Sequence, residues 1–132
     1  MGKNHTEKAM ELRNEVPMKN NCAETIMRAY AEDLNLPSDI AASLGSNFGG
    51  GMKCGSVCGA ITAGLMILGA KGITSPVLLS EFRSRMAESH DGLMNCSDLL
   101  KRNAERGGSK KGHCDGMIQS AIALIDEMTG EN

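Results

Sequence analysis

The fold is decided by one stretch near the middle of the chain, residues 57–68, with the sequence Val57-Cys58-Gly59-Ala60-Ile61-Thr62-Ala63-Gly64-Leu65-Met66-Ile67-Leu68. Its residues are apolar on nearly every side of a helix, a pattern that is typical of a helix buried in a protein core. It also contains several small residues, which allow neighbouring backbones to approach closely. The stretch therefore predicts a central helix that begins at residue 55 or 56, runs through residue 68 and is surrounded by other helices.

The segments on both sides of this stretch also have helical patterns. Apolar residues at helical spacing and capping residues predict helices over residues 6–15, 21–34, 38–44, 75–86, a short segment after 95, and 113–128. Aromatic residues make up only 2% of the chain, which argues against a sheet. A length of 132 residues fits one domain. We therefore predict an all-α, compact, single-domain bundle, spanning 1–132, of about five to seven helices around residues 57–68.

Composition excludes several classes of function. The net charge is −2 and the isoelectric point is near 5.9, so the chain lacks the basic character of nucleic-acid-binding proteins. The longest apolar run, residues 57–70, is too short to span a membrane. Residues 1–7 carry no apolar segment of the kind found in secretion signals. We expect a cytoplasmic protein with neither nucleic-acid nor membrane partners.

The five cysteines give the first indication of function. In a reducing compartment disulfides do not persist, so such thiols are buried, bind metal or are redox-active. Four of them fall in or beside the first turn of a predicted helix, where unpaired N–H groups favour the thiolate. The thiolate is both the nucleophile and the metal ligand. These four are Cys22, Cys58, Cys96 and Cys114. The competing interpretation is that free cysteines are simply small buried hydrophobes.

A glycine-rich segment precedes Cys54 and contains Gly49-Gly50-Gly51. It is either a flexible turn or a place where bare backbone approaches a bound cluster or anion. It lacks the Lys-Ser/Thr ending of a phosphate-binding loop. The Cys54–Cys58 spacing is one residue wider than C-x-x-C, so zinc is weakly supported and a thioredoxin-type motif is excluded.

Residues 101–111 form a run rich in lysine and arginine, which we expect to be a loop. Most such runs are simply solvated. The alternatives are that its charge lowers the pKa of the Cys114 thiol or attracts an anionic partner.

Taken together, these motifs resemble those of the C_GCAxxG_C_C family of redox-active proteins. The resemblance covers about residues 20–128, leaving 1–19 as an N-terminal extension with a short helix. It rests on Asn21-Cys22-Ala23-Glu24, Phe48-Gly49-Gly50-Gly51-Met52, Cys58-Gly59-Ala60-Ile61-Thr62-Ala63-Gly64, Asn95-Cys96-Ser97-Asp98-Leu99-Leu100 and Cys114. It implies that Cys22, Cys58, Cys96 and Cys114 are the family's four cysteines and that Cys54 is an addition. It implies redox chemistry without naming a substrate.

Three functional hypotheses follow. The first is a thiol–disulfide exchange site that needs no cofactor and works with a redox partner protein, a small thiol or another electron donor. In this hypothesis Cys58 is the central residue, and Cys22 or Cys96 is its partner. The backbone approaches the bound group at four glycines, Gly49, Gly50, Gly51 and Gly59. The second is an electron-transfer protein with an iron–sulfur cluster on the same four thiolates, with Cys54 as a possible extra ligand. The third is a non-catalytic helical interaction module with buried cysteines.

Overall fold

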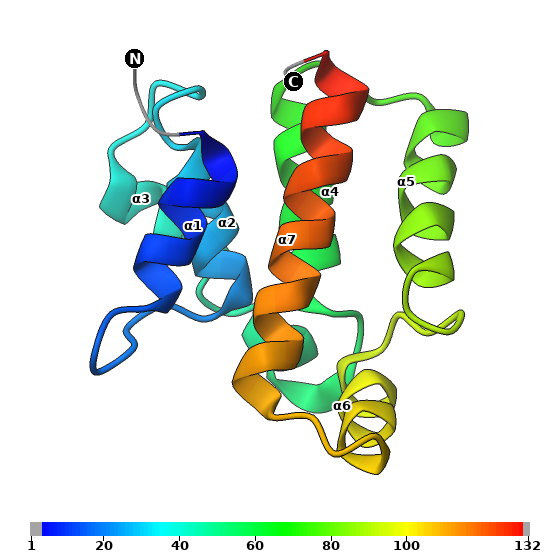
Figure 1. Ribbon diagram of the computed structural model, residues 1–132. Coiled ribbons are helices and arrows are strands. Elements are labelled where there is room, and N and C mark those ends of the chain that lie inside the picture. The colour runs from blue at the N-terminus through cyan, green and yellow to red at the C-terminus, as the bar shows by residue number, and fades with distance from the viewer. Residues whose placement is uncertain (1–3, 131–132) are drawn as a thin grey trace.

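The computed structural model describes residues 4–130 and confirms the all-α prediction (Figure 1). The described residues form seven α-helices and one short distorted turn, η1, with no strand among them. The helices are α1 (His5–Arg13), α2 (Cys22–Tyr30), α3 (Ser38–Gly45), α4 (Gly59–Ala70), α5 (Pro76–Glu88), α6 (Cys96–Glu105) and α7 (Lys110–Thr129), and η1 covers Gly51–Gly55. The expected domain, 1–132, includes residues 1–3 and 131–132, which lie outside the described part. Within that part no helix is both long and apolar enough to cross a membrane.

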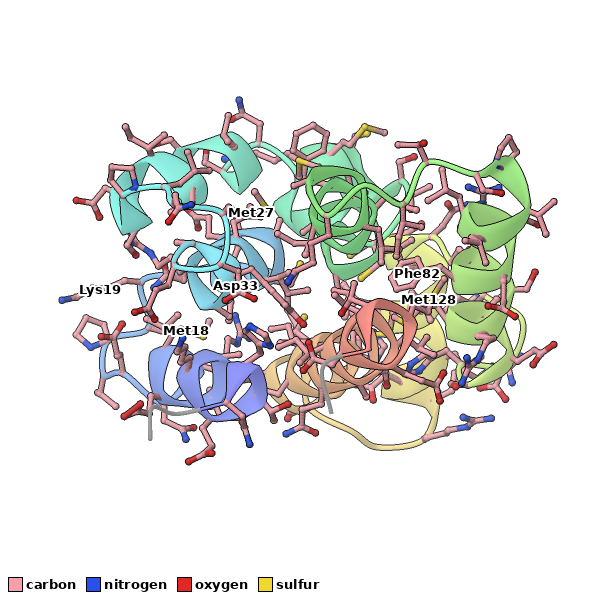
Figure 2. All side chains as sticks on the ribbon, turned by 90° about the horizontal axis from the view of Figure 1, so that it is seen from above. Met18, Lys19, Met27, Asp33, Phe82 and Met128 are labelled. Atoms are coloured by element: carbon pink, nitrogen blue, oxygen red, sulfur yellow. The ribbon has the colours of Figure 1, made fainter. Side chains whose placement is uncertain are left out.

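The predicted central helix is α4, which packs against α2, α5 and α7 (Figure 1). Its small residues permit the close packing that the sequence predicts. A Cβ atom at Gly64 would lie 2.5 Å from the Phe82 ring, so the absence of a side chain there makes room for that ring. Figure 2 shows Phe82 in the space between α5 and α7. Phe82 is fully buried and is one of only two phenylalanines in the chain.

The start of α4 lies later than the sequence predicts, at Gly59 instead of residue 55 or 56. Residues just before it are extended, and Val57 forms an isolated antiparallel bridge with Asn95. This long-range pairing removes these residues from the helix. Tertiary contact has therefore overridden the local apolar pattern.

The glycine-rich segment turns in the left-handed sense before α4 begins. Four consecutive residues, Gly50, Gly51, Met52 and Lys53, have φ values of 66°, 62°, 57° and 58°. Residues with a Cβ atom rarely adopt this conformation, so glycine at the first two positions reduces its cost. At Gly51 a Cβ atom would also lie 2.2 Å from the Ser56 carbonyl oxygen. The segment is thus a shaped turn and not a flexible connection.

The basic segment 101–111 is mostly helical, contrary to our expectation of a loop. Its first residues extend α6 to Glu105, and α7 begins at Lys110 instead of residue 113. The Ser109 hydroxyl caps α7 by accepting a hydrogen bond from the Gly112 N–H at 3.1 Å. Only residues 106–109 connect the two helices.

The N-terminal helix α1 packs on α2 and α7. The His5 ring stacks on Tyr30, with 3.8 Å between ring centroids. Its Nε2 and Nδ1 atoms lie 2.9 Å from carboxylate oxygens of Asp33, labelled in Figure 2, and of Asp126. The N-terminal extension is therefore held to the bundle by specific contacts.

Candidate functional site

Four of the five cysteines line a single cavity of about 400 Å³. They are Cys22 on α2, Cys58 just before α4, Cys96 on α6 and Cys114 on α7. All five cysteines are free thiols. Cys22 and Cys58 are buried, whereas Cys96 and Cys114 are partly exposed. The structure thus brings together the four cysteines that the sequence singled out.

Backbone hydrogen bonds between two segments place Cys58 next to Cys96. The Cys58 N–H donates to the Met94 carbonyl at 2.9 Å, and the Cys96 N–H donates to the Ser56 carbonyl at 2.7 Å. Each cysteine directly follows one member of the Val57–Asn95 bridge. The bridge therefore aligns the start of α4 with the start of α6.

A capping box fixes Cys22 as the first residue of α2. The Asn21 side chain accepts from the Glu24 N–H at 2.8 Å, and the Glu24 carboxylate accepts from the Asn21 N–H at 2.9 Å. The contact between the Cys22 sulfur and α4 depends on Gly59, because a Cβ atom at that position would lie 2.7 Å from the sulfur. Any larger residue at position 59 would push α2 and α4 apart at the sulfur.

Cys22 and Cys58 form a hydrogen-bonded pair of thiols in which the two protons are held very unequally. A hydrogen bond from Cys58 lowers the pKa of Cys22 to about 6, and the N–H groups of Gly50 and Ala23 add to this effect against burial. The same hydrogen bond, together with burial, raises the pKa of Cys58 well above its usual range. The pair thus favours the thiolate at Cys22 and the thiol at Cys58.

The expectation that all four helix-start cysteines favour the thiolate is wrong. Burial raises the pKa values of Cys96 and Cys114, and the nearby Cys22 raises them further. Because α7 begins earlier than predicted, Cys114 lies beyond its first turn, where the free N–H groups are out of reach. Desolvation outweighs position in the helix at both residues.

Sequence comparison identifies the family of the chain. A family model described as "putative redox-active protein (C_GCAxxG_C_C)" matches residues 20–128. The match covers most of the chain and includes all four cavity cysteines. The chain belongs to the C_GCAxxG_C_C family. Comparisons with curated proteins and with solved structures gave no match.

The glycines of the C_GCAxxG_C_C motif shape the site in different ways. Gly50 lines the cavity, and its N–H is hydrogen bonded to the Cys22 sulfur. Gly49 leaves room for the Asn21 side chain, since a Cβ atom there would lie 2.3 Å from the amide nitrogen. Gly51 and Gly59 likewise permit close approaches within the protein, to Ser56 and to Cys22. The bare backbone thus meets the protein's own backbone, the Asn21 side chain and the Cys22 sulfur.

Cys54, the additional cysteine, lies on η1 and is exposed. Its thiol donates a long hydrogen bond of 3.5 Å to the Gly51 carbonyl. It is not among the residues that line the four-cysteine cavity. The geometry therefore separates Cys54 from the other four.

Sequence reasoning missed two residues of the cavity wall, Arg13 and Met18. The wall also includes Asn21, Lys110, Lys111 and His113, which lie in or beside the motif and the basic segment that the sequence singled out. Arg13 and Met18 belong to the N-terminal extension, outside the residues that the family model matches. No local pattern marks Arg13 as a site residue, although it is only 2% exposed. Its position becomes visible only when α1 is packed on the bundle.

The four thiols are the candidate ligands of any metal or cluster. Within residues 4–130 no three His, Cys, Asp or Glu side chains are grouped closely enough to hold a metal ion. The donor set of the cavity is nevertheless four cysteine sulfurs, which is the set that binds iron–sulfur clusters.

Proposed function

We propose that this protein carries out thiol–disulfide exchange, with Cys22 as the attacking thiolate and Cys58 as the resolving thiol. The observation that supports this most directly is the hydrogen-bonded Cys22–Cys58 pair, in which the pKa of Cys22 is lowered to about 6. The sequence indicated Cys58 as the central residue with Cys22 or Cys96 as its partner and did not order them; the proposal takes Cys22 as the partner and assigns the attack to it. It agrees with the redox description of the family.

The proposed reaction has two steps. The Cys22 thiolate attacks one sulfur of a disulfide R–S–S–R, so that a mixed disulfide forms and one RS⁻ leaves. Cys58 then loses its proton, attacks the Cys22 sulfur and releases the second RS⁻. The protein pair is oxidised to a disulfide by two electrons, and the substrate is reduced to two thiols after protonation.

Cys96 and Cys114 complete the proposed four-thiol site. Their sulfurs are partly exposed, whereas Cys22 and Cys58 are buried. They are therefore the cysteines of the site that a redox partner protein reaches most easily. The proposal includes a cytoplasmic location, because free thiols persist in a reducing compartment.

The proposal is tested by incubating reduced protein with bis(2-hydroxyethyl) disulfide and mapping the products by mass spectrometry. We expect a Cys22–Cys58 disulfide in the wild-type protein and a trapped mixed disulfide at Cys22 in Cys58→Ser. Cys22→Ser should abolish the fast reaction, whereas Cys54→Ser should leave it unchanged. A fast reaction that survives Cys22→Ser would refute the assignment.

A second candidate function is electron transfer by an iron–sulfur cluster, and the convergence of four thiols on one cavity favours it. Cys22, Cys58, Cys96 and Cys114 would hold the cluster, which would supply one-electron chemistry. An absorption spectrum with iron and sulfide analysis on anaerobically purified protein separates the candidates. Charge-transfer bands with stoichiometric iron would contradict the dithiol proposal. A colourless, metal-free sample whose five cysteines all alkylate slowly would instead indicate a non-catalytic module.

A further inference from the structure

We infer that the four-cysteine cavity selects small disulfides that carry negative charge. This inference specifies the substrate class of the proposed exchange reaction and depends on that reaction taking place. Three observations support this: the charge of the cavity wall, the size of the cavity and the burial of the reactive pair.

The charged side chains that line the cavity are all basic. They are Arg13, Lys110 and Lys111, and the described lining includes no aspartate or glutamate. The nearest carboxylate partner is Asp115, which Arg13 contacts at 2.6 Å and Lys111 at 2.8 Å. Within residues 4–130 Lys110 makes no ion pair. Three cationic groups thus face one carboxylate, so the cavity carries excess positive charge.

The size of the cavity favours a small molecule over a protein segment. Its volume of about 400 Å³ lies within the range of roughly 300–1,000 Å³ typical of small-molecule sites. Cys22 is 7% exposed and Cys58 is 5% exposed. A disulfide held on the surface of a folded protein would not reach sulfurs at this depth. A free disulfide of a few carbon atoms would.

Lys110 is the residue through which charge selection can be tested. It is exposed, at the first position of α7, and its charge acts on both of the outer thiols, Cys96 and Cys114. An anionic disulfide that enters the cavity is attracted by this charge, and a cationic one is repelled. Such attraction raises association rates and weakens as ionic strength increases.

The experiment compares three disulfides of similar length that differ in charge. They are cystamine, which is cationic, bis(2-hydroxyethyl) disulfide, which is neutral, and dithiodiglycolate, which is anionic. Each rate of oxidation of the reduced protein is divided by the rate of the same disulfide with dithiothreitol, which removes differences in intrinsic reactivity. At low salt we expect dithiodiglycolate to react about tenfold faster than cystamine on this scale, and the ratio to approach one in high salt.

Two variants with a matched control complete the test. Lys110→Gln should slow dithiodiglycolate about threefold relative to the neutral disulfide in the same variant, and Lys110→Glu should favour cystamine. Lys101→Gln removes the same charge from α6, away from the cavity lining, and should change nothing. Equal normalised rates for all three disulfides would overturn the inference but leave the exchange function intact. No reaction of Cys22 with the neutral disulfide would instead refute the exchange function itself.

Discussion

One hydrogen bond between two buried thiols sets the acidity of the proposed nucleophile. Cys22 receives this bond together with N–H groups of Gly50 and Ala23, and these contacts outweigh the cost of burying a thiolate. Cys58 donates it and stays protonated, since its own pKa is raised. The two residues are both buried and both near helix starts. Their proposed roles differ because Cys58 donates the shared proton and the Cys22 sulfur accepts it.

The pH dependence of alkylation tests this arrangement residue by residue. For wild-type protein we expect the rate of Cys22 modification by iodoacetamide to rise with pH around a midpoint of about 6, as the thiolate forms. Cys58→Ala removes the largest contribution that lowers the pKa of Cys22, so the midpoint should move upward toward the ordinary range of thiols. Peptide mass spectrometry gives the rate for each cysteine.

The matched control for this experiment is Cys54→Ala, which removes a thiol outside the cavity and should leave the midpoint unchanged. A midpoint in Cys58→Ala equal to that of wild type would show that Cys58 does not stabilise the thiolate.

At the scale of elements, the site depends on how the left-handed turn meets the start of α4. The turn carries the Gly50 N–H to the Cys22 sulfur. The Ser56 N–H closes the turn by donating to the Gly51 carbonyl at 2.9 Å. Immediately afterwards the chain pairs with the segment before α6. A small distortion in this connection would therefore move three of the four cysteine-bearing segments.

Gly51→Ala tests the turn, and Gly69→Ala is its matched control. At Gly51 a Cβ atom would meet the Ser56 carbonyl at 2.2 Å in a backbone with φ of 62°, so we expect destabilisation of at least about 2 kcal/mol. At Gly69, inside α4, a Cβ atom would meet nothing within 4 Å. Alanine there should be neutral or stabilise the protein by up to about 1 kcal/mol. Urea unfolding measures both, and equal effects would show that the turn carries no special constraint.

At the scale of the whole molecule, Arg13 joins the N-terminal extension to the redox cavity. Its Nε atom donates to Asp115 on α7 at 2.6 Å, and its Nη1 atom donates to the Asn20 carbonyl at 2.9 Å. The side chain is 3% exposed, so the buried guanidinium depends on these partners. Burial raises the pKa of Asp115, but hydrogen bonds from Lys111 and Arg13 outweigh this effect and lower the pKa overall. α1, α2 and α7 are thus tied together next to the thiols.

Arg13→Met should lower the free energy of unfolding by about 2–4 kcal/mol, because it leaves a partly buried carboxylate and a buried carbonyl with fewer partners. Arg102→Met is the control, since the Arg102–Glu105 pair is exposed and long at 3.6 Å, and we expect a change below about 0.5 kcal/mol. Chemical unfolding monitored by circular dichroism gives both values. A double variant with Asp115→Asn should recover part of the loss, and no recovery would show that the ion pair is not the cause.

The helices, and the four cysteines that the fold brings to one cavity, could be predicted from the sequence. Helix formation depends on contacts between residues three or four positions apart, and these are visible in the chain itself, as in the Asn21–Glu24 capping box. The apolar stretch around Ile61 likewise indicated the buried centre of the bundle, because burial on all sides leaves its own pattern. The predictions failed for the residues before Gly59 and for the basic segment that ends at Lys111, where other parts of the chain set the helix boundaries.

The sequence by itself therefore determined the all-α class, the central helix and the family, with its four cysteines. Only the tertiary structure decided that the pKa of Cys22 is lowered while that of Cys58 is raised, and that Arg13 and Lys110 line the same cavity. The physical reason is range along the chain. A pKa depends on the groups within a few ångströms in space, and Cys22 and Cys58 meet only when α2 packs against α4.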